Sequence, residues 1–287
     1  MIPLQSLNVK FRNLKLYKKI TKYAIFSVAL FCYSTSHAAL YTNPSDTIRP
    51  LPQLNKQLNV VANIIMDQDS IAGMDSATIL SVLAGVNTLF SPISASFSLC
   101  KVNYIYDYQY DTIGSYVEQS EMYNQYWQTN RVNLFFIDKF TGDLAAECGN
   151  AEVGAVTFNS PNGITIMKNC FTAYVLAHEL GHYFSLTHTF GAGTSVTQEL
   201  VNESNCSTTG DLICDTPADP FVVGTADSVY ITSSCIFIDA KDKDANNQYY
   251  DPDVTNIMSY YVPCVCHFSW GQYQKMANYY LSNPIEW

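Results

Sequence analysis

Basic residues are scarce in this chain of 287 residues, and they gather at its N-terminus. The chain has 15 Lys and Arg against 25 Asp and Glu. Six of the basic residues precede residue 23 with no acidic residue among them, which leaves nine against 25 in the remainder, a net charge of −16. A protein this acidic repels phosphate, which excludes a nucleic-acid binder. The surplus carboxylates suit a soluble exported protein and can bind calcium.

Long apolar runs are also missing, apart from Tyr23–Tyr33. This run follows the basic residues and precedes Ser36-His37-Ala38, a small-x-small cleavage signal, so residues 1–38 are predicted to be a signal peptide. The alternative, an uncleaved anchor, is disfavoured because a membrane span needs roughly 20 apolar residues. We therefore expect a secreted (extracellular) or periplasmic protein, with no stable membrane span after signal removal.

The sequence contains no CxxC pair, since its closest cysteines are Cys264 and Cys266, and this absence disfavours a cysteine-bound metal. Of nine cysteines, Cys32 leaves with the signal peptide, and an even number remains for disulfides in an oxidising compartment. Five lie between positions 206 and 266, in a region rich in Ser, Thr, Asn, Asp and Gly. At least two disulfides are expected there: Cys206–Cys235, and Cys214 with Cys264 or Cys266.

Hydrophobic patterns predict a mixture of strands and helices before position 185, and one helix near the end. The predicted strands cover residues 58–66, 94–106, 132–137, 153–158 and 163–167. The predicted helices cover residues 75–90, 116–129, 171–184 and 270–281. Between these last two helices the regularity falls. The 249 residues that remain after signal removal suffice for one large domain or two lobes around a cleft.

Histidine is rare, yet three of the five histidines lie between positions 178 and 188. His178 and His182 are four residues apart, so on a helix they share one face and can bind one ion. Glu179 flanks that face, where it can take a proton from a water molecule. His188 requires the helix to end and the chain to return. Three imidazoles form the ligand set of a catalytic zinc, and a helix with solvent-facing histidines is the disfavoured alternative.

The run from His178 to His188 resembles the zinc motif of the metzincin peptidases, and Asn256-Ile257-Met258-Ser259-Tyr260 resembles their Met-containing turn. Further segments resemble the pappalysin (cytophagalysin-like) family, from about residue 132 to residue 276 and more faintly back to residue 58. These segments are His188-Thr189-Phe190, the GDLICDTP run at 210–217, and Phe268-Ser269-Trp270-Gly271-Gln272 with Met276.

The resemblance implies an α+β, metzincin-like fold. Its N-terminal part would be a twisted mixed β-sheet with backing and active-site helices, and its smaller C-terminal lobe would be loop-rich and stapled by disulfides, with a cleft between. We expect a lead-in or short pro-segment at 39–56 and a catalytic domain at 57–287, with subdomains 57–184 and 185–287. An extended peptide would add to the edge of a strand at 154–158.

By the same resemblance the protein is a zinc-dependent endopeptidase that acts on a protein or peptide substrate. Glu179 would be the general base, and Tyr260 would hydrogen-bond the oxyanion. Met258 would form an apolar floor under the zinc ligands, which would be His178, His182 and His188.

Some members of the family bind calcium, which implies a Ca2+ site at Asp211, Asp215 and Thr216. The acidic loop from Asp242 to Asp253 is also spaced like a calcium loop, but a solvated loop is favoured because the turn glycine is missing. The family's glycine after the second histidine is Ser185 here. Serine adopts the positive φ of a helix break at a cost of about 1 kcal/mol.

Two other functions remain open. One is a non-catalytic binding module or pseudoenzyme on the same fold, which the presence of Glu179 disfavours. The other is a gluzincin-type peptidase with Glu199 or Glu203 as third ligand, which His188 and Met258 disfavour.

Overall fold

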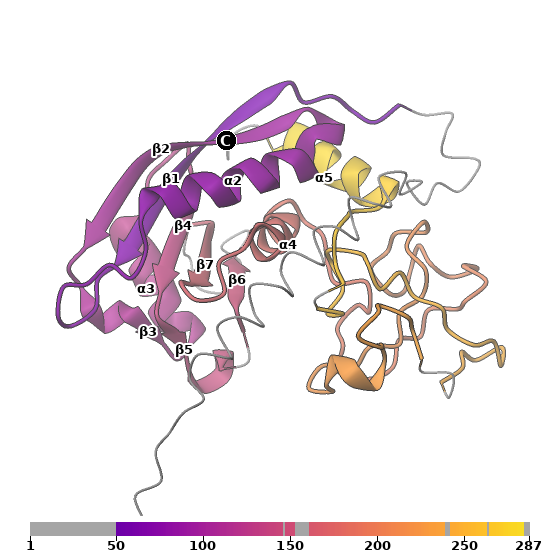
Figure 1. Ribbon diagram of the computed structural model, residues 1–287. Helices are drawn as coiled ribbons and strands as arrows, with labels where there is room; N and C mark the ends of the chain where they lie inside the picture. Colours follow the sequence, from indigo (N-terminus) through magenta and orange to yellow (C-terminus); the bar gives the residue numbers. More distant parts are fainter. Residues whose placement is uncertain (1–49, 146, 153–160, 239–241, 263, 284–287) are drawn as a thin grey trace, which may run out of the picture. The chain divides into compact units, whose positions relative to one another are not determined.

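The computed structural model describes residues 50–145, 147–152, 161–238, 242–262 and 264–283 (Figure 1). The predicted signal peptide, most of the predicted lead-in and the predicted strand at 153–158 lie outside these residues. Residues 40–287 form one compact unit. The division into two subdomains stays a prediction.

A five-stranded sheet occupies the first part of this unit, in the order β2-β1-β4-β7-β6. The first four strands of this order run parallel, and β6 runs antiparallel to β7 at one edge. The sheet is therefore mixed, and with its helices it confirms the predicted α+β class. The strands are β1 (Lys56–Ile65), β2 (Ala95–Ile105), β4 (Val132–Ile137), β6 (Gly149–Glu152) and β7 (Gly163–Met167).

Helices cover both faces of the sheet, which explains why the central strand β4 is buried along its whole length. Along β4, Leu134 and Phe136 pack into one cluster with residues of α2, α4 and α5, while Phe135 and Ile137 pack into another with residues of α3. The helices are α2 (Ser76–Phe90), α3 (Tyr116–Tyr126), α4 (Ala173–Tyr183) and α5 (Trp270–Ser282).

These bounds confirm, to within three residues at each end, the predicted helices and the predicted strands that fall on described residues. The sequence patterns missed β6 and the small parallel pair β3 (Thr112–Ile113) and β5 (Lys139–Phe140). These strands are too short to carry an apolar period. Strand β6 is stabilised by pairing with β7 and by contact with α4, and neither interaction can be read from consecutive residues in the sequence.

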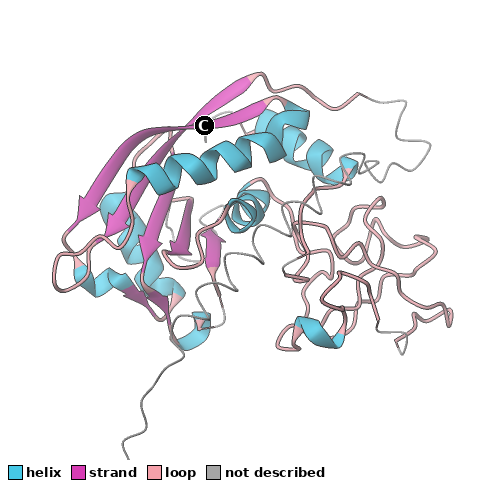
Figure 2. Ribbon diagram, in the orientation of Figure 1, coloured by secondary structure: helices cyan, strands magenta, loops and turns pink. Residues whose placement is uncertain are grey.

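The segment between α4 and α5 is irregular, as predicted, but it has a core of its own (Figure 2). Among its described residues, regular structure is limited to the short helix η5 (Asp227–Val229) and isolated bridges. Its buried cluster is largely aromatic and includes Phe190, Phe221, Tyr230 and Tyr261. Aromatic packing therefore stabilises this lobe in addition to its disulfides.

The prediction of at least two disulfides in this lobe is confirmed, but the predicted pairing is wrong. The structure joins Cys206 to Cys214 and Cys235 to Cys264, and Cys266 is in neither bond. Turns within the lobe bring these cysteines together, and the spacing of cysteines in the sequence does not indicate where the turns lie. A third disulfide, Cys148–Cys170, was not predicted, and it joins the start of β6 to the segment before α4.

The expectation of no stable membrane span after signal removal stays a prediction. Among the described residues, Ser76–Ile93 has the length and apolar composition of a span. However, α2 buries Ile79, Leu83, Val86 and Phe90 against the protein core. The core helix of a water-soluble protein has the same composition, so this segment is weak support for a membrane span.

Candidate metal site

Helix α4 carries the first two histidines, and both its start and its buried side are well defined. The Thr172 side-chain oxygen accepts a hydrogen bond from the N–H of Val175 at 3.2 Å, which caps the first turn. Leu176 and Leu180 are buried in the core cluster that also contains sheet residues. The helix is therefore fixed in rotation about its own axis.

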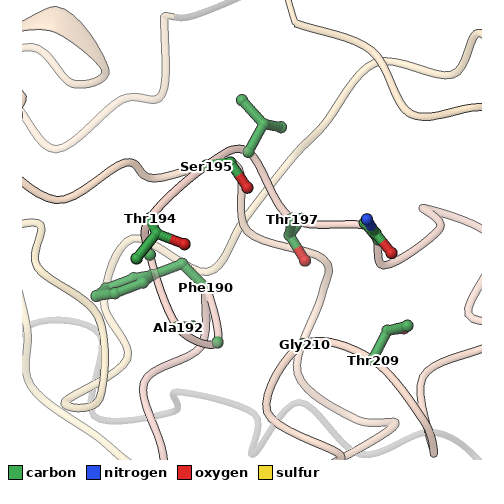
Figure 3. A pocket seen from close by; sticks show the side chains of 11 residues that line it. Phe190, Ala192, Thr194, Ser195, Thr197, Thr209 and Gly210 are labelled. Atoms are coloured by element: carbon green, nitrogen blue, oxygen red, sulfur yellow. The ribbon is translucent and has the colours of Figure 1, made fainter.

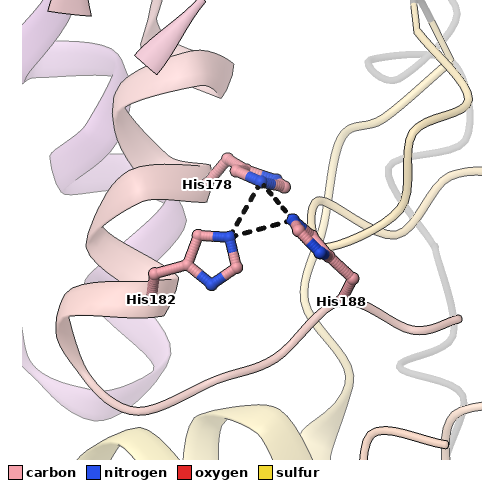
Figure 4. A group of neighbouring side chains, drawn as sticks. All are labelled: His178, His182 and His188. Carbon is pink, nitrogen blue, oxygen red and sulfur yellow. Dashed lines mark hydrogen bonds between the residues drawn. The ribbon is translucent and has the colours of Figure 1, made fainter. Parts of the chain in front are cut away.

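The helix ends in a tight turn at Ser185, whose φ is +72°. The N–H of Ser185 donates to the carbonyl of His182 at 2.8 Å, and the N–H of Leu186 donates to that of Gly181 at 2.9 Å. The predicted helix break is thus confirmed, with serine in the left-handed region. The reversal brings His188 back to face α4 (Figure 4).

Three imidazole nitrogens converge at this turn. The Nε2 atoms of His178 and His182 lie 3.1 Å apart, those of His182 and His188 lie 3.0 Å apart, and those of His178 and His188 lie 3.3 Å apart. Tetrahedral zinc with Zn–N bonds of about 2.0–2.1 Å separates its ligand atoms by roughly 3.3 Å. Among the described residues, no other group of three His, Cys, Asp or Glu side chains is gathered closely enough to share an ion.

Backbone carbonyls orient two of the three rings. Nδ1 of His178 lies 2.7 Å from the Ile257 carbonyl oxygen, and Nδ1 of His182 lies 2.9 Å from that of Leu186. A carbonyl oxygen only accepts, so each Nδ1 donates its proton and each Nε2 of the neutral ring presents a lone pair. Lone pairs that face one another at about 3 Å repel unless a cation lies among them. The donor set therefore fits a metal ion.

Burial keeps these rings neutral. Removal from water, with the charge of His182, lowers the pKa of His178 to about 3. Burial likewise lowers the pKa of His182 and of His188 below the ordinary value.

The carboxylate of Glu179 lies against the edge strand β6, and its side chain is 5% exposed. A Cβ at Gly149 would lie 2.6 Å from Oε1 of Glu179, so glycine leaves the room that this carboxylate occupies. The N–H of Ala151 donates a hydrogen bond to it. Burial and the nearby charge of Glu147 raise the pKa of Glu179 to about 8. Strand β6 thus fixes the carboxylate that Glu179 extends from α4.

Met258 packs directly against that helix. It is fully buried, and a Cβ at Gly181 of α4 would overlap its sulfur. The N–H of Thr189 donates to the Met258 carbonyl at 3.2 Å, which ties the segment after His188 to the same turn. The methionine therefore lies against α4 at Gly181, and its role as a floor under the histidines stays a prediction.

Tyr260 lies beside two of the three histidines. Its ring centroid is 4.6 Å from that of His188 and 5.8 Å from that of His178. Burial, with the charges of Glu147 and Glu179, raises the pKa of Tyr260 above its ordinary value, so the hydroxyl keeps its proton. A protonated phenol can donate a hydrogen bond to a developing negative charge.

The three predicted calcium ligands are only partly together. The Thr216 hydroxyl lies 2.9 and 3.0 Å from the two carboxylate oxygens of Asp211, and both residues are buried. Asp215 instead caps α5, where it accepts hydrogen bonds from the Ser269 hydroxyl at 2.9 Å and from the N–H of Gly271 at 2.7 Å. Both oxygens of Asp215 thus accept hydrogen bonds at the start of α5, whereas Asp211 and Thr216 contact each other.

Glu199 is a buried carboxylate to which the sequence assigned only an alternative zinc role. Its side chain is 1% exposed, and neither oxygen has a hydrogen-bond partner. Burial, with the charges of Asp211 and Asp219, raises the pKa of Glu199 to about 8. Neither Glu199 nor the exposed Glu203 belongs to the histidine group, so the gluzincin arrangement is absent from the described residues.

An open cavity of about 230 Å³ lies next to Gln198 and Gly210. It is lined by residues 190–198 with Thr209 and Gly210, and Figure 3 shows the side chains around it. Gly210 lines the cavity and lies close to the Glu199 carboxylate, because a Cβ at this glycine would overlap Oε2 of Glu199.

The acidic loop at 242–253 uses its carboxylates within the fold. Asp244 accepts hydrogen bonds from the N–H groups of Val201, Asn246 and Gln248 at 2.8–2.9 Å. Asp253 pairs with His267 at 2.9 Å. These contacts agree with the rejection of a calcium loop here.

Sequence comparisons point to metallopeptidases over the same region. Residues 76–189 match the family described as Metallo-peptidase family M12B Reprolysin-like, a match that includes all three histidines and Glu179. An extracellular metalloprotease of Sordaria macrospora is 26% identical over 239 residues, which cover 78% of this chain and 74% of that protein.

Two solved structures share the fold. Mature mirolysin of Tannerella forsythia, in complex with a cleaved peptide, has a TM-score of 0.56 at 16% identity and covers 82% of this chain and 99% of its own. A mutant of promirolysin from the same organism has a TM-score of 0.55 at 14% identity, over 96% of this chain and 91% of its own. The predicted metzincin-like α+β fold is confirmed.

Sequence reasoning missed the residues that position the predicted ones. Gly149 and Ala151 lie about 30 positions before Glu179, in a strand without a pattern. The spacing Ser269-x-x-Gln272 is a capping box, and this signal was visible in the sequence.

We predict that Ser185→Gly raises the free energy of unfolding by up to about 1 kcal/mol, because glycine adopts φ of +72° without strain. Urea unfolding would measure this gain, and zinc affinity should hold or rise slightly. Ser70→Gly is the matched control, since exposed Ser70 has φ of +61° far along the chain from the histidines. Loss of zinc binding by Ser185→Gly would contradict the prediction and would indicate that the serine hydroxyl organises the turn.

Proposed function

We propose that this protein is a secreted zinc-dependent endopeptidase of the pappalysin (cytophagalysin-like) kind. The observation that carries the proposal is the convergence of three imidazole nitrogens beside a buried glutamate. The matches to a metallopeptidase family and to an extracellular metalloprotease support the peptidase class and an exported protein. Three disulfides suit an oxidising compartment.

His178, His182 and His188 would hold the zinc ion through Nε2. Three protein ligands are the number typical of catalytic zinc, whereas structural zinc has four. When bound, the ion would supply Lewis acidity to the scissile carbonyl and to the attacking water.

Glu179 would serve as the general base. Its carboxylate would take one proton from the water that attacks the scissile carbonyl, and it would give that proton to the amine nitrogen as the C–N bond breaks. The proton count therefore balances over one turnover. The contacts with Gly149 and Ala151 support this role, because they hold the carboxylate on the sheet side of the histidines.

Tyr260 would donate its hydroxyl proton in a hydrogen bond to the oxygen of the tetrahedral intermediate. Its ring contacts with His188 and His178 support this assignment. A peptide substrate would lie along β6, which is the edge strand among the described part of the sheet and the strand that touches Glu179.

Two substitutions test the proposal. Glu179→Gln should keep stoichiometric zinc and lose turnover of a peptide substrate by more than the ~10²–10⁴-fold typical of acid–base help alone, because the water also becomes less nucleophilic. His182→Ala should lose both zinc and turnover. Elemental analysis of the purified protein and hydrolysis of a quenched-fluorescence peptide library provide the two readouts.

Glu147→Gln is the matched control, since Glu147 lies near Glu179 but has no proposed role in zinc binding or proton transfer. This substitution should therefore leave most of the activity. Near-wild-type hydrolysis by Glu179→Gln would reject the mechanism. A wild-type protein that binds zinc but cleaves nothing in the library would favour the pseudoenzyme.

Tyr260→Phe should lower kcat by about 10–1,000-fold with little change in KM, because an oxyanion donor acts mainly in the transition state. Steady-state kinetics on one peptide would measure it. Tyr261→Phe is the neighbouring control, because its hydroxyl donates to Asp219 at 2.6 Å and should affect stability rather than kcat. An unchanged kcat in Tyr260→Phe would reduce this residue to a packing role.

We also propose a calcium site built on Glu199, with Asp211 and Thr216. The observation that supports it is the buried Glu199 carboxylate, which lacks any hydrogen-bond partner. A buried carboxylate is costly unless a proton or a cation compensates it. Oxygen ligands from carboxylates, hydroxyls and backbone carbonyls suit calcium.

Calcium should therefore raise the melting temperature of the wild-type protein and not that of Glu199→Gln. At about 100 times the Kd, calcium binding would add roughly 2.7 kcal/mol to the free energy of unfolding. Glu203→Gln is the matched control, since Glu203 is exposed and its charge also reaches Glu199. Equal calcium stabilisation of the wild type and Glu199→Gln would disprove the site.

A further inference from the structure

A reciprocal pair of amides anchors the turn beneath the histidines. Nδ2 of Asn256 donates to Oε1 of Gln272 at 3.0 Å, and Nε2 of Gln272 donates to Oδ1 of Asn256 at 3.0 Å. Both side chains are fully buried. Each amide thus satisfies the other where no water competes, and such a pair has one geometry.

On one side of the pair, Asn256 shapes the turn. Its Oδ1 also accepts a hydrogen bond from the N–H of Met258 at 2.9 Å, and its carbonyl accepts one from the Ser259 hydroxyl at 2.8 Å. Ile257 lies between these two contacts, and its carbonyl oxygen is the atom that accepts from Nδ1 of His178 at 2.7 Å. The position of Asn256 therefore fixes the direction of the carbonyl that orients His178.

On the other side, the start of α5 fixes Gln272. Its Oε1 accepts from the N–H of Ser269 at 2.8 Å, and its own N–H donates to the Ser269 hydroxyl oxygen at 3.1 Å, which completes a capping box. The carboxylate of Asp215 holds Ser269 in turn. Gln272 thus has a fixed rotamer and one side-chain donor group aimed at Asn256.

We propose that Gln272 is a positioning residue for the histidine site, and that it acts through Asn256 and the Ile257 carbonyl on His178. The inference rests on the proposed zinc site. Outer partners that hold a metal-bound histidine typically change metal affinity by 10–100-fold when they are removed. Gln272 acts one step farther out than the Ile257 carbonyl. Its removal should therefore change zinc affinity by a factor near the lower end of that range.

Gln272→Met preserves the length of the side chain and removes both amide contacts with Asn256. We expect the Kd for zinc, measured by competition with a chromophoric chelator, to rise about 10-fold. The visible absorption of the cobalt-substituted protein should shift as the His178 ring turns. Neither readout requires peptidase activity.

A double-mutant cycle tests the route of the effect. Because Gln272 acts through Asn256, the double variant Asn256→Ala/Gln272→Met should have the zinc Kd of Asn256→Ala alone. Asn133→Leu is the matched control, since Asn133 is also fully buried and holds backbone groups at residues 128 and 131. It should lower the melting temperature and leave the zinc Kd unchanged.

Should Gln272→Met fail to fold, Gln272→Glu keeps both acceptor contacts of Oε1 and replaces the donation to Asn256 with an acceptor oxygen that faces Oδ1 of Asn256, so its zinc Kd should also rise. A wild-type zinc Kd in the folded Gln272 variant would overturn this inference alone, as would additive losses in the cycle. A wild-type protein that binds no zinc would overturn the proposed function as well.

Discussion

Three uncharged imidazoles with their Nε2 lone pairs turned toward one point form the constraint on which the rest of this structure depends. Such an arrangement is unfavourable by itself, because the lone pairs repel and the rings are removed from water. The fold must therefore hold the rings and the adjacent Glu179 in place, and it does so from three directions. These are the end of α4, the edge strand β6 and the turn that contains Met258.

Each direction contributes something different. The helix end, with Ser185 in a left-handed conformation, returns the chain so that His188 meets α4. Strand β6 lacks a side chain at Gly149 and so leaves space for the carboxylate of Glu179. The Met258 turn packs against α4 at Gly181 and supplies the carbonyl that orients His178. The same backbone segments therefore position the candidate site residues and pack against one another.

Local signals in the sequence predicted most of this arrangement. The spacing of the histidines and the apolar periods identified α4 and its neighbours, because helix and strand periodicity are written in consecutive residues. The disulfide pairing was not predicted correctly, and the hydrogen bonds of Asp215 at the start of α5 were not predicted, because both depend on how irregular segments fold against each other. Strand β6 was missed for the same reason, since its four residues have no period and form through contacts with β7 and α4.

The two carbonyls that orient the histidines differ in their distance along the chain. His182 uses a carbonyl four positions away, whereas His178 uses one 79 positions away. A polypeptide still emerging from the ribosome therefore presents all three histidines long before the second orienting group has been made. At the proposed zinc site the ion would be held fully only once the C-terminal helix has docked, so metal loading would be a late step of biosynthesis. A chain cut short before that helix would be an incomplete and inactive product rather than a smaller peptidase.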